Sequence, residues 1–334
     1  MKVGVIGTGG MGNVHARHYK NISGVELFAW DRDADKLGAF SKHHGATKAT
    51  SYDNLLSQVD LIDICVPTSL HLEAVLQSID AGVATLVEKP MARRLDECKQ
   101  MIDAANAKNV LLGVGHVVRF FPEHRRIHDL VVAGEVGKPA SCRMRRGGKA
   151  PLGSEGWFRD PAHSGGVMLD LAIHDYDWMR WTFGEVKQVF AKSVRLGKTV
   201  SGAKFEGDYA LTTLTFESGV VGHCETTWMD PAGFRATVEV SGSEGIIEFD
   251  SRLAPPVRMS TDSGSIAMSQ MDGSDDPYFR HLSAVVSAVR TGTPMPITGV
   301  EGMAAVAIAE AAIVSAMENR PIDPRELLKQ VVGV

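Results

Sequence analysis

A glycine-rich segment near the start of the chain constrains its fold more than any other feature. Residues 2–7, KVGVIG, have the small and β-branched side chains of a strand, and residues 11–21 have the apolar spacing of a helix. The segment between them fits the pattern GxGxxG: Gly7, Thr8, Gly9, Gly10, Met11 and Gly12. In a strand-turn-helix unit such glycines permit a tight turn, close approach of a pyrophosphate and close packing of helix on strand. The sequence therefore predicts a dinucleotide-binding domain with these residues at the cofactor.

An acidic residue follows at the end of the next predicted strand, VELFAWD. Asp31 stands 19 residues after Gly12, where a carboxylate accepts hydrogen bonds from a ribose 2′-hydroxyl and repels a 2′-phosphate. We therefore expect NAD to be the cofactor. The next residue, Arg32, could pair with that same phosphate, so NADP stays open as an alternative.

Strand and helix patterns alternate over residues 1–120. Strands are predicted at 2–7, 25–31, 61–67, 84–90 and 110–115, and helices near 11–21, 33–43, 70–81, 95–108 and 122–133. Alternation of this kind produces a parallel sheet covered by helices on both faces. We predict a doubly wound Rossmann domain of the α/β class over residues 1–120.

The pattern changes after residue 139. Strand-like runs occupy 140–149, 188–196, 209–217, 220–228, 236–242 and 245–250, and helical patterns occupy 166–183, 277–290 and 300–318. Residues 251–277 are rich in Ser, Gly and Pro and read as a mobile loop or a pair of weak strands. We predict a second α/β domain over residues 121–334, with a mostly antiparallel sheet.

Composition excludes several classes of protein. The formal charge of -5 gives no general positive field for a nucleic acid, and the longest apolar run, taken as residues 60–67, is too short for a membrane. The four cysteines form no CxxC pair, which argues against a zinc site or a disulfide framework, and we predict no metal. No secretory signal is visible at the first residues. We expect a soluble cytoplasmic protein with no nucleic-acid or membrane partner.

Two motifs lie where parallel strands are predicted to end. VPTSLH contributes Pro67, Thr68 and His71, and EKP contributes Glu88 and Lys89. In an open α/β sheet, ligands bind outside the carboxyl ends of the strands, so all five are candidates for cofactor contact. The Lys89 ammonium is also suited to stabilise a substrate oxygen beside the nicotinamide.

A possible acid-base pair lies in the second domain. Asp170 and His174 are four residues apart in a predicted helix and would share one face. An imidazole titrates near neutral pH, so His174 could take the proton of an alcohol, while Asp170 holds it or binds a neighbouring hydroxyl. The alternative is a pair that only interacts with itself.

At this point the motifs carry a resemblance. GTGGMG, PTSLH, EKP, GHVVRFFPE and WFRDPAHSGGVMLDLAIHDYDWMRW occur in this order within residues 1–185 and resemble the Gfo/Idh/MocA family of sugar and cyclitol oxidoreductases. The resemblance implies a Rossmann domain, a second domain with a large open sheet, and NAD(P)-dependent hydride transfer at a secondary alcohol. It implies the catalytic group Lys89, Asp170 and His174. Two small residues depart from the family pattern, since Ser164 and Ala172 replace common glycines.

The resemblance also implies residues around the substrate. It places Arg119, Phe120 and His71 near substrate or nicotinamide, and His116 is a candidate for the same pocket. From the residues alone, Trp157 in a predicted loop could stack on a sugar ring.

For several other polar residues, a place on the protein surface is the more typical interpretation than a functional role. A cluster of Arg143, Arg145 and Arg146 could bind phosphate but is more typical of a solvated strand face, on which the first two share a side. His124 and His128 read as surface residues of a helix.

The preferred hypothesis is an NAD(P)-dependent dehydrogenase of an inositol-like cyclitol or an aldose. One alternative is a glycosidase that uses NAD for transient ring oxidation, and another is a regulator that binds NAD(P) or sugar without catalysis. We expect a homodimer or homotetramer, assembled through an apolar open sheet face.

Overall fold

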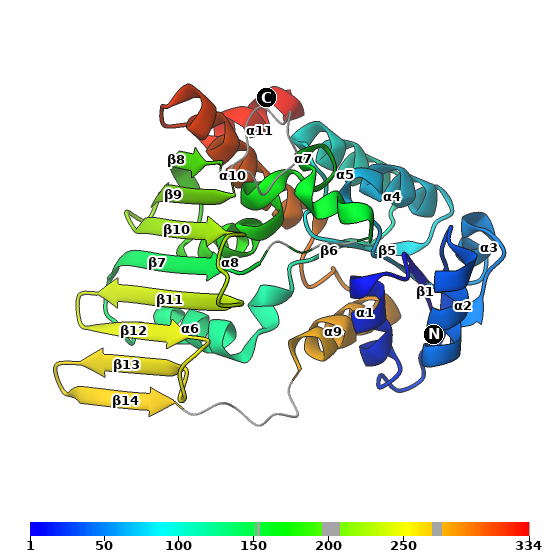
Figure 1. Ribbon diagram of the computed structural model, residues 1–334, viewed down its shortest axis with the longest axis horizontal. Coiled ribbons are helices and arrows are strands. Elements are labelled where there is room, and N and C mark those ends of the chain that lie inside the picture. Colours follow the sequence, from blue (N-terminus) through cyan, green and yellow to red (C-terminus); the bar gives the residue numbers. More distant parts are fainter. Residues whose placement is uncertain (150, 152–153, 196–207, 269–275, 334) are drawn as a thin grey trace. The chain divides into compact units, whose positions relative to one another are not determined.

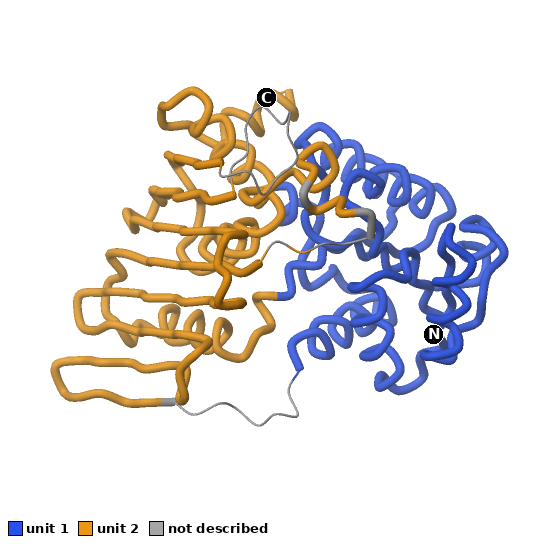
Figure 2. Tube along the Cα trace, viewed as in Figure 1, with its two compact units in different colours: residues 1–117, 153–155, 276–303 blue, residues 118–152, 156–275, 304–334 orange. Residues whose placement is uncertain are grey.

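The computed structural model describes residues 1–149, 151, 154–195, 208–268 and 276–333. The chain forms two compact units, shown in Figure 2. Unit 1 contains residues 1–117, 153–155 and 276–303, and unit 2 contains 118–152, 156–275 and 304–334. The predicted domain boundary at residue 120 stays a prediction, but the units are interleaved in sequence, because residues 276–303 return to unit 1.

Unit 1 contains a six-stranded parallel sheet with the strand order β3-β2-β1-β4-β5-β6, of which β1, β5 and β6 are labelled in Figure 1. This order is that of the doubly wound dinucleotide-binding fold, so the predicted class is confirmed. The elements are β1 (Lys2–Ile6), α1 (Gly10–Tyr19), β2 (Glu26–Trp30), α2 (Ala34–His44), β3 (Thr47–Lys48), α3 (Tyr52–Leu56), β4 (Leu61–Ile64), α4 (His71–Asp80), β5 (Ala84–Glu88), α5 (Leu95–Lys108) and β6 (Leu112–Gly115). The short β3 and α3 were not predicted.

The central strands of this sheet are buried on both faces, as parallel strands between helices must be. Val3 and Val5 of β1 have no exposed surface, and all four residues of β4 are buried. Gly4 lies between them in sequence, and a Cβ there would come within 2.9 Å of the Ile62 side chain. The missing side chain therefore lets β1 and β4 share one tightly packed core. Helix α9 (Pro277–Thr291) packs on α1 and adds Leu282 and Val285 to that core.

Unit 2 contains an eight-stranded sheet with the order β14-β13-β12-β11-β7-β10-β9-β8. Every neighbouring pair is antiparallel except β7 and β10, so the predicted large, mostly antiparallel sheet is confirmed. The strands are β7 (Pro139–Gly147), β8 (Val186–Val194), β9 (Tyr209–Phe216), β10 (Val221–Thr227), β11 (Arg235–Gly242), β12 (Gly245–Asp250), β13 (Val257–Thr261) and β14 (Gly264–Met268). Two weak strands thus form within 251–277, while 269–275 lie outside the described residues.

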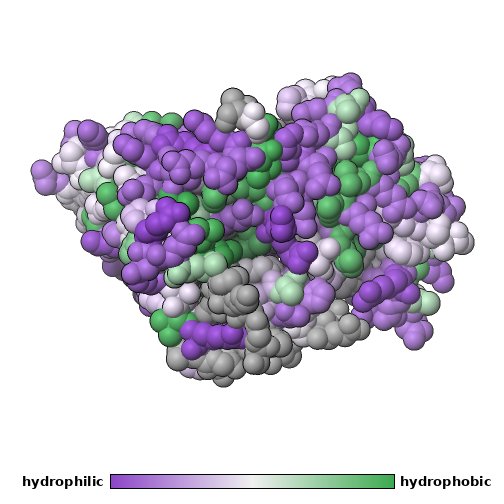
Figure 3. Space-filling view, turned by 90° about the horizontal axis from the view of Figure 1, so that it is seen from above, coloured by the Kyte–Doolittle hydropathy of each residue, from purple (hydrophilic) through white to green (hydrophobic). Residues whose placement is uncertain are grey.

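Helices cover one face of this sheet. Helix α8 (Ile173–Phe183) packs on β7 and β10, and α6 (Pro122–Val132) packs on α8. The other face is polar: Arg143 pairs with Glu239 across 2.7 Å and Arg145 with Glu225 across 3.2 Å. Figure 3 views the molecule from above, toward the β8 edge of the sheet, and there hydrophilic residues cover most of the surface with hydrophobic ones in smaller patches. Charges of the central strands therefore pair across this face, but the exposed Leu211 lies opposite Glu225 on the same face, so the expectation of an apolar open face stays a prediction.

The longest apolar stretch lies in α10 (Gly299–Glu318) and not in residues 60–67 as predicted. Within the described part of the chain, α10 is the one helix long and apolar enough to cross a membrane. A helix in a protein core meets the same criteria, and 61% of its most apolar window is buried. The last helix, α11 (Pro324–Val332), was not predicted.

Two buried ion pairs fasten α8 within unit 2. Arg146 at the end of β7 contacts Asp175 through Nε and Nη2 at 2.8 and 2.6 Å, and Arg119 contacts Asp177 at 2.8 and 2.6 Å. Strand alternation explains why Arg146 differs from its neighbour Arg145: successive side chains point to opposite faces. The arginine cluster is thus not a single surface, since Arg146 faces the buried side.

This division predicts unequal effects of two similar substitutions on stability. Arg146→Met leaves the buried Asp175 carboxylate without its cation, and we expect the free energy of unfolding to fall by about 3–5 kcal/mol. Arg143→Met removes an exposed pair three strand positions earlier and should cost less than about 1 kcal/mol. Urea unfolding of both variants measures the two changes in the free energy of unfolding. Equal decreases would show that the buried pair contributes no more to stability than the exposed one.

Candidate functional site

The glycine-rich segment forms a tight turn between β1 and α1. Gly7 has a φ of 89°, and a Cβ there would lie 2.7 Å from the backbone of Cys65. A Cβ on Gly12 would lie 2.1 Å from the Gly7 carbonyl oxygen, so only glycine lets α1 begin this close to β1. At Gly9 and Gly10 a Cβ would meet nothing within 4 Å, and no side chain caps the N-terminus of α1. Backbone N–H groups at an open helix N-terminus fit a pyrophosphate.

Asp31 is tied to this turn. Its Oδ2 accepts hydrogen bonds from the Thr8 backbone N–H at 2.7 Å and from the Thr8 hydroxyl at 2.8 Å. Its Oδ1 accepts from the Asp33 N–H at 2.9 Å, and the neighbouring Arg32 is exposed. Beside Thr8 is a hollow of about 530 Å³ that includes Asn13 and Lys36. The acid predicted to select the ribose therefore stands at the glycine turn, and the set fits a dinucleotide.

Lys89 follows directly on β5 and is half-buried. The Glu88 carboxylate beside it is buried, and its Oε2 accepts from the Lys89 backbone N–H at 3.2 Å. On the other side, the His71 ring lies between two backbone carbonyls, with Nε2 3.0 Å from Val66 O and Nδ1 3.0 Å from Pro90 O. Burial lowers the pKa of His71. Glu88 and His71 thus contact the backbone of residues 89 and 90, on either side of the Lys89–Pro90 bond. Their predicted contacts with the cofactor stay predictions.

The remaining residues of the VPTSLH motif lie in the turn after β4. Thr68 is buried and begins a short 3₁₀ helix (Thr68–Leu70), and Pro67 precedes it and is half-buried. Both follow the carboxyl end of a central parallel strand, as predicted.

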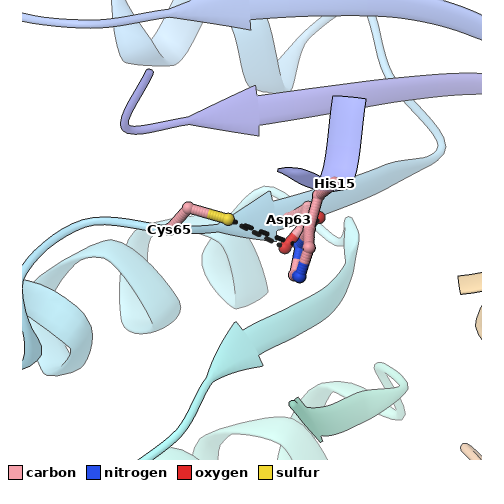
Figure 4. Close-up of side chains that lie close together, drawn as sticks. All are labelled: His15, Asp63 and Cys65. Atoms are coloured by element: carbon pink, nitrogen blue, oxygen red, sulfur yellow. Dashed lines mark hydrogen bonds and ion pairs between the residues drawn. The ribbon is translucent and has the colours of Figure 1, made fainter. Parts of the chain in front are cut away.

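A buried polar cluster beneath these loops was not predicted. His15 of α1, Asp63 of β4 and Cys65 point toward one another in Figure 4. His15 Nδ1 lies 2.8 Å from Asp63 Oδ2, and Cys65 Sγ lies 3.5 Å from both His15 Nδ1 and Asp63 Oδ1. These donor atoms lie within 4.8 Å of one another, which is close enough to hold a metal ion. The sequence did contain one signal, because an acid inside the buried strand LIDI requires a partner.

The acid-base pair of unit 2 lies at a change of helix type. Asp170 is in a π-helical turn (Val167–Leu171), where the Ala172 N–H donates to the Val167 carbonyl, and His174 is in the first turn of α8. The predicted helical stretch over 166–183 is present, but it is divided into this π turn and α8. Asp170 is buried and His174 half-buried, and whether they share a face stays a prediction.

The residues predicted to surround the substrate differ in burial and lie on different elements. His116 is fully buried after β6 in unit 1. Arg119 lies in a 3₁₀ turn (Val117–Phe120) with its guanidinium on Asp177 and 5.5 Å from the Trp181 ring. Trp157 lies in a 3₁₀ helix (Ser154–Arg159) rather than a loop, stacked on Phe158 at 3.8 Å. Their substrate contacts stay predictions.

Unit 2 also has a cavity of about 560 Å³ that the sequence did not reveal. Its lining includes Phe121, His124, Arg146, Phe234 and Phe249. His124 was predicted at the surface, but it is 3% exposed and packs edge-on against Trp178 and Phe249. Burial lowers its pKa to about 3, so the ring is neutral. His128 was also misplaced, since it stacks on Trp181 at 3.4 Å.

Comparison with known proteins gives consistent matches over the chain. Residues 1–116 match the oxidoreductase family with an NAD-binding Rossmann fold, and residues 124–248 match the GFO/IDH/MocA C-terminal domain. Myo-inositol 2-dehydrogenase of Thermotoga maritima is 29% identical over 342 aligned residues that cover 100% of both chains.

Two solved structures extend the likeness to three dimensions. GenD2 from gentamicin A biosynthesis, solved in complex with NAD, is 29% identical with a TM-score of 0.85, covering 97% of this chain and 96% of its own. Myo-inositol 2-dehydrogenase from Lactobacillus plantarum is 25% identical with a TM-score of 0.82, covering 97% and 99%.

The position of Asp31 predicts a change in cofactor preference. Asp31→Ala removes the carboxylate at the glycine turn, and we expect the Kd for NAD to rise by roughly 10-fold or more, with the NAD to NADP preference shifted toward NADP. Asp33→Ala is the matched control, since its side chain caps α2 and pairs with Lys36 but makes no contact with Thr8 of the glycine turn. Fluorescence titration with both cofactors measures the ratio. An unchanged ratio in Asp31→Ala would place the ribose elsewhere.

Proposed function

The chain belongs to the Gfo/Idh/MocA family of oxidoreductases with an NAD-binding Rossmann fold, and we propose that it oxidises a secondary alcohol of a cyclitol or sugar. One observation carries the substrate class: a relative named myo-inositol 2-dehydrogenase matches over the full length of both chains. Inositol-like polyols are therefore the first substrates to test, and aldoses the second.

The residues of unit 1 would bind the dinucleotide. The backbone of residues 7–12 and the N-terminus of α1 would hold the pyrophosphate, and Asp31 would accept from a ribose hydroxyl. When bound, NAD⁺ supplies an acceptor for a hydride. Asp31 favours NAD because its charge repels a 2′-phosphate, whereas the exposed Arg32 leaves some binding of NADP.

We assign the chemical step to Lys89, Asp170 and His174. The alcohol loses a hydride from its carbon and a proton from its oxygen, so the products are a ketone, NADH and one proton. His174 takes the hydroxyl proton, and the Lys89 ammonium stabilises the negative charge that develops on oxygen. Asp170 accepts a hydrogen bond from His174 or from a neighbouring substrate hydroxyl. The reverse reduction uses the same groups in the opposite order.

We also propose a cytoplasmic location and a homodimer or homotetramer. All four cysteines are free, and Cys98, Cys142 and Cys224 are buried, which suits a reducing compartment. The charged pairs on the polar sheet face would dock against matching charges of a second copy. Sedimentation at micromolar concentration tests the assembly, and a monomer at low and moderate salt would contradict it.

The proposed activity predicts a direct spectroscopic result. Purified protein with NAD and a panel of inositols and aldoses should raise the absorbance of reduced nicotinamide with at least one polyol. Release of aglycone from a glycoside without net NADH would instead establish a redox-assisted glycosidase. Cofactor binding with neither reaction, across an extended panel that includes nucleotide sugars, would favour a regulator.

The role of His174 predicts a selective loss of turnover. His174→Ala should lower kcat by roughly 10²- to 10⁴-fold, because a general base is removed, while the Kd for NAD changes little. The matched control is His223→Ala, a half-buried histidine on the polar sheet face near Thr213. Steady-state kinetics and fluorescence titration separate the two effects. Equal losses of turnover and of NAD affinity would remove His174 from the chemical step.

A further inference from the structure

The Glu88 carboxylate connects the catalytic lysine segment to the buried cluster below it. Its Oε2 accepts from the Lys89 backbone N–H, and its Oε1 lies 3.3 Å from His15 Nε2. His15 has no exposed surface and its other ring nitrogen, Nδ1, contacts Asp63 at 2.8 Å. One imidazole therefore bridges two buried carboxylates, and one of them belongs to the residue before Lys89.

Space for this carboxylate is provided on its far side by a glycine. Gly115 of β6 pairs with Glu88 of β5, and a Cβ on Gly115 would lie 2.6 Å from Glu88 Oε1. The Glu88 oxygen that contacts the His15 ring thus occupies space that a side chain at position 115 would need. Such double confinement fixes the direction in which the chain leaves β5.

The electrostatics of the bridge favour a charged imidazole. Burial is the largest single influence and opposes ionisation, but Asp63 and Cys65 together outweigh it, so the pKa of His15 is raised well above its usual value. For Glu88, burial is likewise outweighed by the His15 hydrogen bond and charge, and the pKa is lowered. Both partners are therefore ionised at neutral pH. The groups facing His15 are Asp63, Cys65, Glu88, His18, Tyr278 and His281, and Tyr19 lies near Asp63.

This charge makes a pH-dependent contribution to stability. A folded pKa raised above the unfolded value of about 6.5 stabilises the fold fully below that pH. The contribution is lost as the pH rises through the folded pKa, because His15 then gives up the proton that holds the two carboxylates together.

A metal ion is a less consistent occupant of the cluster. The 2.8 Å separation of His15 Nδ1 and Asp63 Oδ2 is that of a charge-assisted hydrogen bond, which a bound ion would replace. A thiolate is also needed for tight zinc binding. Burial raises the pKa of the Cys65 thiol well beyond neutral pH, so an ion bound there would first have to displace the thiol proton.

We infer that His15 is a positioning residue for Lys89: by bridging Asp63 and Glu88 it fixes the end of β5 from which the lysine extends. This inference rests on the proposed function for its effect on turnover. It assigns to α1, whose N-terminus faces the cofactor, a second task at the reacting end of the same unit.

A set of substitutions tests the bridge. His15→Gln keeps a polar side chain but removes the charge, and we expect kcat to fall roughly 10- to 100-fold, the loss typical of a misplaced catalytic group. The Kd for NAD should stay within about 2-fold. His18→Gln is the matched control on the same helix, since His18 contacts Asp276 and stacks on Tyr278 outside the bridge. Its kcat should stay within about 2-fold of the unmodified protein.

A double-mutant cycle separates positioning from general damage. If His15 acts through Glu88, then His15→Gln combined with Glu88→Gln lowers kcat no further than Glu88→Gln alone. The alkaline fall in kcat that follows deprotonation of His15 should also be absent from His15→Gln. Effects that multiply, or a kcat within about 2-fold in His15→Gln, would overturn the inference. So would stoichiometric zinc in the purified protein.

Two further measurements keep the test decisive. Gly115→Ala displaces the Glu88 carboxylate without touching His15, so it should reproduce the loss if His15→Gln fails to fold. Reductive methylation of Lys89, followed by mass spectrometry across pH, needs no activity. Its rate should change several-fold in His15→Gln and not in His18→Gln. A protein that oxidises no polyol but shows this labelling difference would refute the proposed function and keep the positioning role, whereas unchanged labelling would refute the positioning role.

Discussion

The close seating of α1 on the first strand is the constraint on which unit 1 depends. Because the Gly12 position has no Cβ, the helix begins against the Gly7 carbonyl, and its N–H groups open toward the glycine turn. The same seating places the side chain of His15, one turn further on, against Asp63 and Glu88. A shift of the helix by the width of a methyl group would disturb the turn, the acid that braces it and the lysine segment together.

Unit 2 uses its charges in two ways along one short helix. Asp175 and Asp177 are buried and paired with arginines from β7 and from the turn after β6, so they fasten α8. Asp170 and His174 belong to the π turn and to the first turn of α8. π turns occur often at functional sites because the added residue shifts side chains that a regular helix would space evenly. The two residues proposed to take part in the chemistry, Asp170 and His174, therefore directly precede the two that fasten α8.

Sequence reasoning succeeded where the determinant was local. Glycine spacing, strand runs and helix periodicity predicted the Rossmann sheet and most strands of the second sheet, because each depends on neighbours along the chain. It failed where the burial of a side chain depends on a partner that is distant in the sequence. Arg146 faces inward and pairs with Asp175 of α8, which lies far along the chain. His124 is buried because Phe249 of β12 packs against it. Nothing near His15 in sequence reveals the carboxylates of β4 and β5. The catalytic roles of Lys89, Asp170 and His174 likewise stay predictions, since these roles depend on contacts with the substrate and the cofactor.

The return of residues 276–303 to unit 1 has a consequence for how the protein is made. A ribosome releases the strands of the parallel sheet first and α9 only after nearly all of unit 2 has emerged. Until then α1 lacks the helix that covers it, and the apolar side chains that meet Leu282 and Val285 stay uncovered. The nascent amino-terminal half is therefore an incomplete domain until α9 has been synthesised. The helix that completes its core, α9, is encoded near the carboxyl-terminal end of the chain.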